Sequence, residues 1–570
     1  MNRIRICWAF SWFIILSLPL IWSATLFADA GDPPARVARL SFINGTVSLQ
    51  PSGANDWSQA SLNYPLTTGD RIYTDQASQA ELEVGSVAVR ASATTDLTVA
   101  NLGDQFMQLG LGQGTIRLRV YDLPEGDSIE VDTPNGALTL LLLGDYRVET
   151  FPDDNTTLVI VNNGSLEVSG GDVSERVESG QAVKLTGTDP IQVAFVSPPA
   201  PDDFDRWCWE RDLRVTSSAS TAYVSDETPG YSDLDVYGTW DEQTPFGPVW
   251  YPVGLPVGWV PYRFGHWVWI WPWGWTWVGS EPWGFAPFHY GRWVFMGGKW
   301  GWVPGPIGMQ PFYAPALVGF VGGPEFSVGI GAGGVQAWFP LGPGEPFFPW
   351  YHYGGNYLRQ VNATNIRHVT NISSLTDISS VNSLHFVNKS VATTVVPTIA
   401  FGSGQRIDRR VIAITPEQLA RAEVIPHPQT NPTARALGGG KPVPTPAGLP
   451  ARATIRAAGQ RQPGVAAPGS TAGGGMANAA PRTTPWLITR TPLPPPNVPF
   501  SDQQQAMRAH PGRPLEPQQQ ENLRAGKPAG PMRDRELPPH PAPAPRAEHT
   551  QPAPKSESRP AAPPPSGGKH

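Results

Sequence analysis

The chain has 570 residues, of which only 16% are charged, while 64 are proline and 60 are glycine. The length could hold about three to four domains of ~150 residues, but this composition excludes both a polyelectrolyte and a chain that is globular throughout. The formal net charge of −7 hides an asymmetry, because residues 431–570 carry 17 Lys and Arg against 7 Asp and Glu. An acidic body with a basic tail follows.

Residues 1–30 have the pattern of an export signal. Two arginines precede an almost wholly apolar run at 6–21, and Ala28-Asp29-Ala30 supplies the small residues of a signal peptidase site. We expect cleavage after Ala30 and a location in the periplasm, at the cell surface or outside the cell. The alternative is an uncleaved membrane anchor, because the apolar run is long for a signal. Only then would a membrane be a partner.

Export also limits the cross-links and partners of the mature chain. Cys7 would leave with the signal, so Cys208 would remain alone and no internal disulfide could form. The position of Cys208 between Trp207 and Trp209 favours a buried thiol. Nucleic acid is not expected as a partner, because the protein is exported.

Residues 36–198 predict a domain of many short strands. Asn44-Gly45 lies between two alternating runs, a pattern typical of a β-hairpin. Alternation places one face of each strand in a core and the other in water, and so many strands imply a β-sandwich or β-roll. The predicted strands are 37–42, 46–50, 80–84, 87–90, 115–120, 128–131, 146–150, 157–161 and 165–168.

The same region resembles the FecR periplasmic domain. The resemblance spans most of residues 36–190 and is carried in order by Leu66-x-x-Gly69-Asp70-Arg71-Ile72, Ala80-Glu81-Leu82, Gly114-x-Ile116-Arg117-Leu118, Val131-x-Thr133-Pro134-Asn135-Gly136 and Gly180-Gln181-Ala182-Val183. It implies a FecR-like fold and a periplasmic or surface location. FecR-type proteins relay signals to a cytoplasmic sigma factor, but only five residues precede the apolar run here, so a signalling role is an alternative and not the leading expectation.

Residues 199–235 are predicted to link this domain to the next. A short helix over 204–212 would place Phe204, Trp207 and Cys208 on one face. Carboxylates and arginines alternate in the same stretch, and local ion pairs would explain them. The residues concerned are Asp203, Asp205, Arg206, Glu210, Arg211 and Asp212.

Residues 236–305 are crowded with tryptophan in a repeating pattern. Tyr237-Gly238-x-Trp240 recurs as Phe264-Gly265-x-Trp267 and as Tyr290-Gly291-x-Trp293, which gives three units with a period near 27. Each unit is expected to form a β-hairpin, and the units to pack together because one hairpin is marginal alone. Trp-rich units of this kind, including the pattern at 258–267, resemble those that follow FecR-like domains in a family of exported bacterial proteins of unknown function.

Aromatic rings could act as ligand contacts or as core. Flat rings stack on sugars and cations, and the segment has more rings than three hairpins can readily hide, which favours an exposed binding surface. For any single ring the core is the commoner place. The candidate ligand-binding residues are Trp240, Tyr262, Trp267, Trp269, Tyr290 and Trp293.

Motifs for catalysis and cofactors are lacking in the sequence. There is no G-x-S-x-G elbow, P-loop or dinucleotide fingerprint, and His266, His289 and His352 lack the spacing of a metal site. We predict no catalytic residues, no metal, no cofactor and no enzymatic activity. A carboxylate site built from distant segments is the alternative, and it would require an acidic cleft beside the aromatic face.

Residues 306–425 form a Gly- and Asn-rich extension that is expected to pack back on the repeats. Thr415 and Pro416 predict the start of a short helix. Residues 426–570 are rich in Pro, Ala and Gly and are predicted to be disordered, because they cannot bury enough apolar surface. Their positive charge suits anionic envelope polymers, or they serve only as a spacer.

The sequence as a whole predicts a mainly β protein without catalytic function in the cell envelope. Its role would be structural or binding, with polysaccharide, peptidoglycan or an envelope protein as the partner. The alternatives are a FecR-type sensory or regulatory protein and a glycan-active enzyme.

Overall fold

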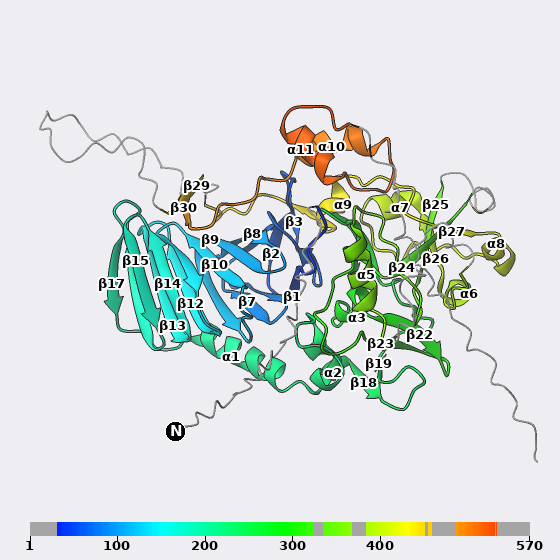
Figure 1. The fold of residues 1–570 in the computed structure, drawn as a ribbon, viewed down its shortest axis with the longest axis horizontal. Coiled ribbons are helices and arrows are strands. Elements are labelled where there is room, and N and C mark those ends of the chain that lie inside the picture. The colour runs from blue at the N-terminus through cyan, green and yellow to red at the C-terminus, as the bar shows by residue number, and fades with distance from the viewer. Residues whose placement is uncertain are drawn as a thin grey trace, which may run out of the picture. The chain divides into compact units, whose positions relative to one another are not determined.

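The computed structural model of the chain describes residues 31–323, 326, 334–367, 384–450, 454–458, 486–530 and 532. The predicted export signal lies outside these ranges, as do residues 533–570 of the predicted tail. The described chain is mainly β, as the sequence predicts (Figure 1). None of the helices within the described ranges combines the length and the apolar character that a membrane crossing requires.

The N-terminal part is built from two layers of mostly antiparallel strands. The first layer contains, in spatial order, β4 (Pro65–Leu66), β1 (Ala38–Asn44), β6 (Gln79–Val84), β7 (Val87–Ala91), β9 (Phe106–Val120), β12 (Gly144–Phe151), β13 (Thr156–Asn163), β16 (Gln181–Thr186) and β17 (Gln192–Val196). The second contains β3 (Trp57–Gln59), β2 (Val47–Gln50), β5 (Arg71–Thr74), β8 (Asp96–Leu102), β9 again, β10 (Ser128–Thr133), β11 (Gly136–Leu140), β14 (Ser165–Gly170) and β15 (Val173–Glu178).

Strand β9 joins the two layers. Its first half pairs with β8 and its second half with β7 and β12. Gly114 lies at the change with a φ of +90°, and a Cβ there would lie 2.6 Å from the Cα of Thr95, so glycine is required. The sheet therefore folds over on itself, as expected for a sandwich or β-roll, and all nine predicted strands coincide with observed ones.

The predicted hairpin at Asn44-Gly45 is wrong. Strand β1 pairs with β4 and β6, while β2 pairs with β3 and β5, so the turn carries the chain from one layer to the other. The backbone N–H of Thr46 donates to Ser78 Oγ (2.9 Å) rather than across a hairpin. Asn-Gly favours a hairpin locally, but strands from further along the chain pair with β1 and with β2 instead.

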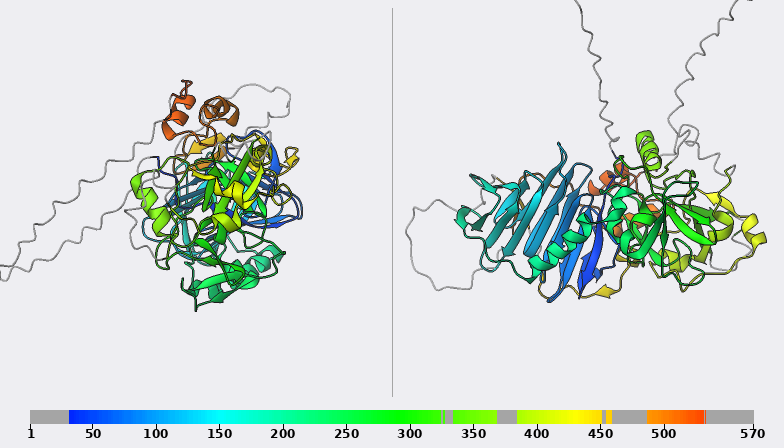
Figure 2. Two further views of the ribbon diagram at one scale, coloured as in Figure 1. Left: turned by 90° about the vertical axis from the view of Figure 1, so that its right-hand side faces the viewer. Right: turned by 90° about the horizontal axis from the view of Figure 1, so that it is seen from below.

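Helix α1 (Asp203–Thr216) covers the outer face of the first layer. Figure 2 shows it lying across these strands. Asp202 caps its N-terminus in a capping box with Asp205. Phe204 and Cys208 are buried and Trp207 is partly so, which confirms the predicted helix, its inner face and the buried thiol. Burial raises the pKa of Cys208 to about 12.

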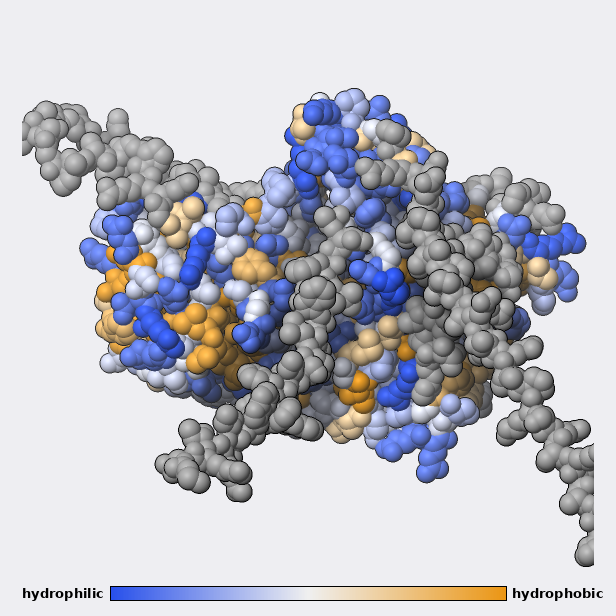
Figure 3. All heavy atoms as spheres, in the orientation of Figure 1, coloured by the Kyte–Doolittle hydropathy of each residue, from blue (hydrophilic) through white to orange (hydrophobic). Residues whose placement is uncertain are grey.

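The far end of the two layers is less well covered. Among the described strands, β17 pairs only with β16 and is an edge strand. Apolar residues gather on the surface where Figure 1 labels β13, β14 and β17 (Figure 3). Phe195 of β17 is 53% exposed, and Leu142 and Leu143 in the turn before β12 are similarly exposed.

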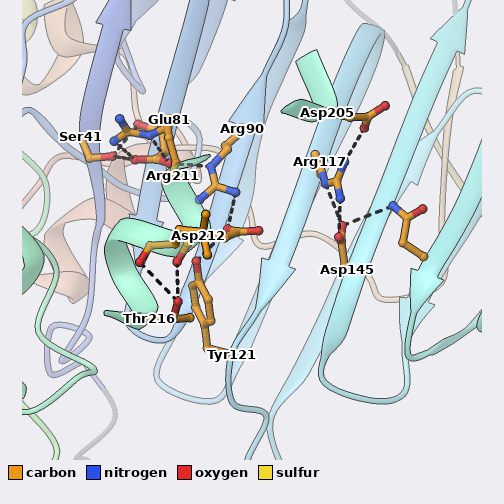
Figure 4. A network of polar contacts seen from close by, with 12 residues as sticks. Ser41, Glu81, Arg90, Arg117, Tyr121, Asp145, Asp205, Arg211, Asp212 and Thr216 are labelled. Atoms are coloured by element: carbon orange, nitrogen blue, oxygen red, sulfur yellow. Dashed lines mark hydrogen bonds and ion pairs between the residues drawn. The ribbon is translucent and has the colours of Figure 1, made fainter. Parts of the chain in front are cut away.

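The acidic and basic residues of α1 pair with the sheet rather than with one another. Arg90 of β7 binds both Glu81 and Asp212 at 2.6 Å (Figure 4). Arg117 of β9 likewise joins Asp145 of β12 to Asp205. Among the paired carboxylates of the helix, only Asp203 bonds within it, to Arg206. The prediction of local ion pairs is therefore wrong for Asp205, Arg211 and Asp212, and residues 199–235 are a docked segment rather than a free linker.

The three Trp-rich units form three β-hairpins, as predicted. These are β18 (Gly238–Asp241) with β19 (Val249–Pro252), β20 (Gly265–Ile270) with β21 (Gly274–Gly279), and β22 (Arg292–Met296) with β23 (Lys299–Val303). The first and third join through β19 and β23 into one four-stranded sheet, and the second stands as a separate two-stranded ribbon.

A cross-strand tryptophan pair recurs at the same place in each hairpin. Trp240 lies opposite Trp250, Trp267 opposite Trp277, and Trp293 opposite Trp302. The glycine two residues before the first Trp lies against the indole of the second. A Cβ on Gly265 would be 2.5 Å from Trp277 Cζ2, with the same crowding at Gly238 and Gly291. This contact explains the glycine in the repeated Tyr/Phe-Gly-x-Trp pattern.

The extension packs back on the hairpins, as expected. It forms a sheet of β26 (Thr394–Pro397), β25 (Val335–Pro340), β24 (Val318–Gly322) and β27 (Glu423–Ile425). Buried asparagines tie it to the repeats. Asn388 donates to the carbonyl oxygen of Trp293 (2.8 Å), and Asn365 accepts from the N–H of Gly291 (2.8 Å). The predicted helix start at Thr415 is confirmed, since Thr415 caps α8 (Pro416–Ala420).

The other α-helices described before residue 426 are short. They are α2 (Leu234–Tyr237), α3 (Ala286–His289), α5 (Gly355–Ala363), α6 (Lys389–Ala392) and α7 (Thr398–Gly402).

Residues after 426 are more ordered than the sequence predicts, in the parts that the structure describes. Elements there are α9 (Arg435–Gly438), β28 (Pro442–Val443), β29 (Thr454–Ala457), β30 (Trp486–Thr489), α10 (Phe500–Met507) and α11 (Pro517–Arg524). Residues before 426 supply hydrogen-bond partners to this C-terminal segment. Trp275 donates to the carbonyl of Thr430 (2.9 Å), and Tyr64 donates to that of Leu437 (2.8 Å).

Candidate functional site

The candidate ligand-binding aromatics lie in the core. Five of the six are at most 5% exposed: Tyr262, Trp267, Trp269, Tyr290 and Trp293. Only Trp240 is half-buried; its indole donates to Ser220 Oγ (3.0 Å), and the ring of Tyr223 lies 4.6 Å away. A buried ring offers no free face to a sugar, so the prediction of ligand contact is wrong for these five residues.

The extension supplies the cover that three hairpins alone could not. The ring of Trp267 contacts those of Phe320, Trp338 and Phe401, at centroid distances of 5.6, 5.4 and 5.3 Å. These partners come from β24, β25 and α7. The repeats by themselves therefore have more rings than they can hide, and β24, β25 and α7 complete the core.

Two of the histidines are also buried. His289 is fully buried, and its Nδ1 lies 2.8 Å from the carbonyl oxygen of Ala314. Burial, with a smaller effect of the charge on Arg39, lowers the pKa of His289 to about 3. His266 on β20 is 8% exposed. Within the described ranges, no group of His, Cys, Asp and Glu side chains could hold a metal ion.

An open cleft of about 720 Å³ lies beside the hairpin β20–β21. Four chain segments line it: residues 59–62 after β3, the hairpin itself, the loop 404–410, and residues 435–441. The full lining is Gln59, Ser61, Leu62, His266, Val278, Gly279, Ser280, Gly404, Gln405, Arg406, Arg409, Arg410, Arg435, Gly439, Gly440 and Lys441. Among the described residues, the lining of this cleft thus includes five cations and no carboxylate.

The loop 404–410 forms one wall. Ile407 anchors it, because its side chain is buried and its N–H donates to the carbonyl of Gly265 on β20 (2.9 Å). On either side of this anchor, Arg406 and Arg409 have side chains that are 53% and 81% exposed. Asp408 binds Arg406 at 3.0 Å and lies 3.9 Å from Arg409.

Residues 435–441 form another part of the lining, where they lie between the N-terminal layers and the second hairpin. The N–H of Gln59 donates to the carbonyl of Lys441 (2.8 Å). A Cβ on Gly440 would lie 2.0 Å from the carbonyl oxygen of Gln59, and one on Gly439 would lie 2.5 Å from His266 Nε2. Consecutive glycines allow the backbone to approach both neighbours this closely.

His266 contributes to the floor of the cleft. Its Nε2 has no hydrogen-bond partner among the described residues. Burial, with the nearby charge of Arg406 as a smaller cause, lowers the pKa of His266 to about 4. The imidazole is therefore neutral at neutral pH, and the charge of the cleft comes from the arginines and Lys441.

None of the six candidate aromatics lines this cleft, and the sequence did not single out the residues that do. A weak signal exists in Arg406-Ile407-Asp408-Arg409-Arg410, a basic cluster in an otherwise acidic body. The glycines at 438–440 are the other signal. Neither signal could be connected to the hairpin β20–β21 from the sequence, because the two segments lie about 140 and 170 residues after β20 and are poor in regular structure.

Comparisons with known proteins give a family for one segment. Residues 231–345 match a family of unknown function (DUF6600), which spans the three hairpins with β24 and β25. No curated protein matches the sequence.

Two crystal structures of a Parabacteroides distasonis protein, provisionally described as an anti-sigma factor, are similar to part of the chain. The identity is 16% and 15% with a TM-score of 0.21 in both cases, and the match covers 23% of this chain and 60% of that one. The chain thus matches less than two thirds of that protein's length.

Proposed function

We propose that this protein is an exported, non-catalytic component of the bacterial cell envelope that binds glycan or cell-wall polymer. One observation carries the proposal: the cleft beside β20–β21 is open and lined largely by charged and polar residues, whereas most of the candidate aromatic rings are buried. Its volume of about 720 Å³ lies within the ordinary range of ligand sites.

The N-terminal layers, which resemble a FecR domain in sequence, would serve as the scaffold of this site. Arg39 on β1 supports that role by donating to the carbonyl oxygen of Pro282 (3.0 Å), just beyond the second hairpin. Asn63 donates to the carbonyl of Glu281 (2.8 Å) in the same loop. These contacts would keep residues 59–62 and the hairpin at a fixed distance, so the cleft would be largely pre-formed.

Co-sedimentation tests the proposal. Full-length exported protein is incubated with peptidoglycan sacculi and with a series of insoluble polysaccharides, and the bound fraction is measured. We expect binding to at least one polymer, and we expect Trp240→Ala, which alters the most accessible of the six candidate rings, to bind as the unaltered chain does. If no polymer retains the protein, the proposed function is wrong.

The intact mass of the exported protein tests its predicted processing. A mature chain that starts at Gly31 would agree with a signal peptide, and one that keeps residues 1–30 would indicate an anchor.

A further inference from the structure

The cleft beside β20–β21 has a charge opposite to that of the chain. Its lining brings together five cations: Arg406, Arg409, Arg410, Arg435 and Lys441. The only carboxylate bonded to any of them is Asp408, among the described residues. The whole chain has a formal net charge of −7, so this excess of positive charge is a local feature.

Three of the five cations have no ion pair in the part of the chain that the structure describes. Arg410, Arg435 and Lys441 are exposed, and no carboxylate of the described residues forms an ion pair with them. Structural arginines of this protein look different, since Arg90 and Arg117 are buried and each joins two carboxylates. The cleft cations are thus not required to satisfy the fold.

Guanidinium groups select a particular kind of anion. Their planar fork bonds carboxylate and phosphate through two parallel N–H donors. Arg406, Arg409 and Arg410 project from one short loop that Ile407 anchors to β20, so several forks are held close to one another. The cleft volume of about 720 Å³ is also far larger than a single inorganic anion needs, since one water molecule takes up about 30 Å³.

The rest of the lining suits hydroxyl groups. Gln59, Ser61, Ser280 and Gln405 supply neutral donors and acceptors, and glycines expose the backbone. Among the described lining residues, the only ring is the imidazole of His266, so nucleic acid bases would find no aromatic platform. Leu62 and Val278 are the only large apolar side chains there, too few to hold an acyl chain.

We propose that this cleft binds an acidic saccharide, a sugar chain that carries carboxylate or phosphate groups. The arginines of loop 404–410 hold the anionic groups, Arg435 and Lys441 hold the same chain from the neighbouring segment 435–441, and the neutral side chains bond its hydroxyls. The inference rests on the proposed function, since it names the class of polymer that the envelope protein binds.

Isothermal titration calorimetry on the full-length protein tests the inference. The probes are a short oligogalacturonate for the carboxylate, a phosphomannan fragment for the phosphate, and a neutral galactose oligomer of equal length. Inorganic phosphate and a single-stranded DNA oligomer complete the set. The test variant is Arg409→Gln with Arg410→Gln. The control is Lys184→Gln with Lys299→Gln, which removes the same charge from two exposed sites outside the cleft.

We expect at least one acidic saccharide to bind, and to bind on the order of tenfold or more weaker to the arginine variant, since charge-assisted hydrogen bonds are lost. The control variant should bind as the unaltered chain does. Equal binding of the neutral oligomer, tighter binding of DNA, or an equal loss in both variants would overturn the inference. Binding of inorganic phosphate as tight as that of the saccharides would do the same.

The two proposals fail in different ways. If envelope polymers sediment with the protein but the arginine variant binds them unchanged, the proposed function stands and the acidic-saccharide site does not. If the acidic probes bind and depend on Arg409 and Arg410 but no envelope polymer retains the protein, the site stands and the envelope role is wrong. Unchanged thermal unfolding of both variants shows that loss of binding is not loss of folding.

Discussion

At the scale of single residues, a glycine and a histidine contribute to the stability of the aromatic core. Gly265 has no room for a side chain, because a Cβ would lie 2.3 Å from the carbonyl oxygen of Val278 and 2.5 Å from the ring of Trp277. His289 is held neutral inside the same core. Each makes a measurable contribution to the free energy of unfolding.

Replacing Gly265 by alanine is expected to destabilise the protein. The added methyl group must displace backbone or an indole in a well-packed core, which costs about 1–3 kcal/mol. Urea unfolding followed by tryptophan fluorescence measures the difference. Gly103→Ala is the control, because a Cβ at Gly103 meets no atom within 4 Å. Equal midpoints for Gly265→Ala and Gly103→Ala would contradict the packing argument.

The buried His289 predicts a loss of stability in acid. Its pKa of about 3 in the folded chain lies below the value of about 6.5 expected when unfolded, so below pH 6.5 the unfolded state binds a proton that the folded state does not. The contribution of His289 is therefore complete above about pH 6.5 and is lost as the pH falls toward 3.

The measurement compares the unaltered chain with His289→Gln at about pH 7 and pH 4.5. The free energy of unfolding of the unaltered chain should fall by about 2–3 kcal/mol more, from two pKa units at ~1.4 kcal/mol each. The comparison between variants is needed because burial raises the pKa of Asp70 and Glu281 to about 7, and these carboxyls favour the folded state in acid. Parallel pH profiles would show that His289 is not the titrating group.

At the scale of elements, a network of ion pairs joins α1 to the first layer. Arg147 of β12 binds Asp205 at 2.6 Å and Asp202 at 2.8 Å. Opposing charges lower the pKa of Glu81 to about 2, because Arg211 and Arg90 outweigh its burial. A buried pair of this kind gives modest net stability while intact, but loss of one partner leaves an uncompensated charge.

Arg117→Met should therefore be strongly destabilising. It leaves the carboxylate of Asp145 without its cation and that of Asp205 with Arg147 alone, and the expected loss is about 3–5 kcal/mol. Arg206→Met is the matched control, because Arg206 pairs with Asp203 at the surface and such pairs contribute about 0–1 kcal/mol. Chemical denaturation measures both. A loss for Arg117→Met no greater than for Arg206→Met would mean that the pairs do not hold α1.

At the scale of the whole molecule, segments far apart in sequence complete one another. The hairpins need the extension to cover their rings, and residues 430–441 cover part of the second hairpin in turn. The cleft exists only because loop 404–410 and residues 435–441 lie against β3 and β20.

A chain that ends after residue 425 should unfold more readily than one that ends after residue 532. The shorter chain leaves the indole N–H of Trp275 and the hydroxyl of Tyr64 without the carbonyls of Thr430 and Leu437. Each unpaired buried group costs about 1–3 kcal/mol, so a loss of at least about 2 kcal/mol is expected in thermal or urea unfolding. Identical stability would show that residues 426–532 are not part of the folded body.

Local patterns in the sequence were enough to predict the N-terminal strands and the three Trp-rich hairpins. Alternation in 80–84 and 87–90 depends on neighbouring residues only, and so does the glycine before each paired tryptophan. The same patterns could not show that Arg90 on the polar face of β7 is buried, because the covering helix lies more than 110 residues later. Nor could they distinguish a hairpin from a crossing between layers at Asn44-Gly45, since the competing partner, β6, is not local.

The sequence by itself determined that this protein is mainly β, that its Trp-rich repeats form three hairpins, and that a short helix follows the N-terminal strands. These follow from side-chain periodicity and turn chemistry, which act over a few residues. Only the tertiary structure decided that the rings are core and that the open site is a cation-lined cleft. Burial and charge clustering depend on which distant segments meet, and contacts between residues 59–62, 265–279, 404–410 and 435–441 are set by packing rather than by any local pattern.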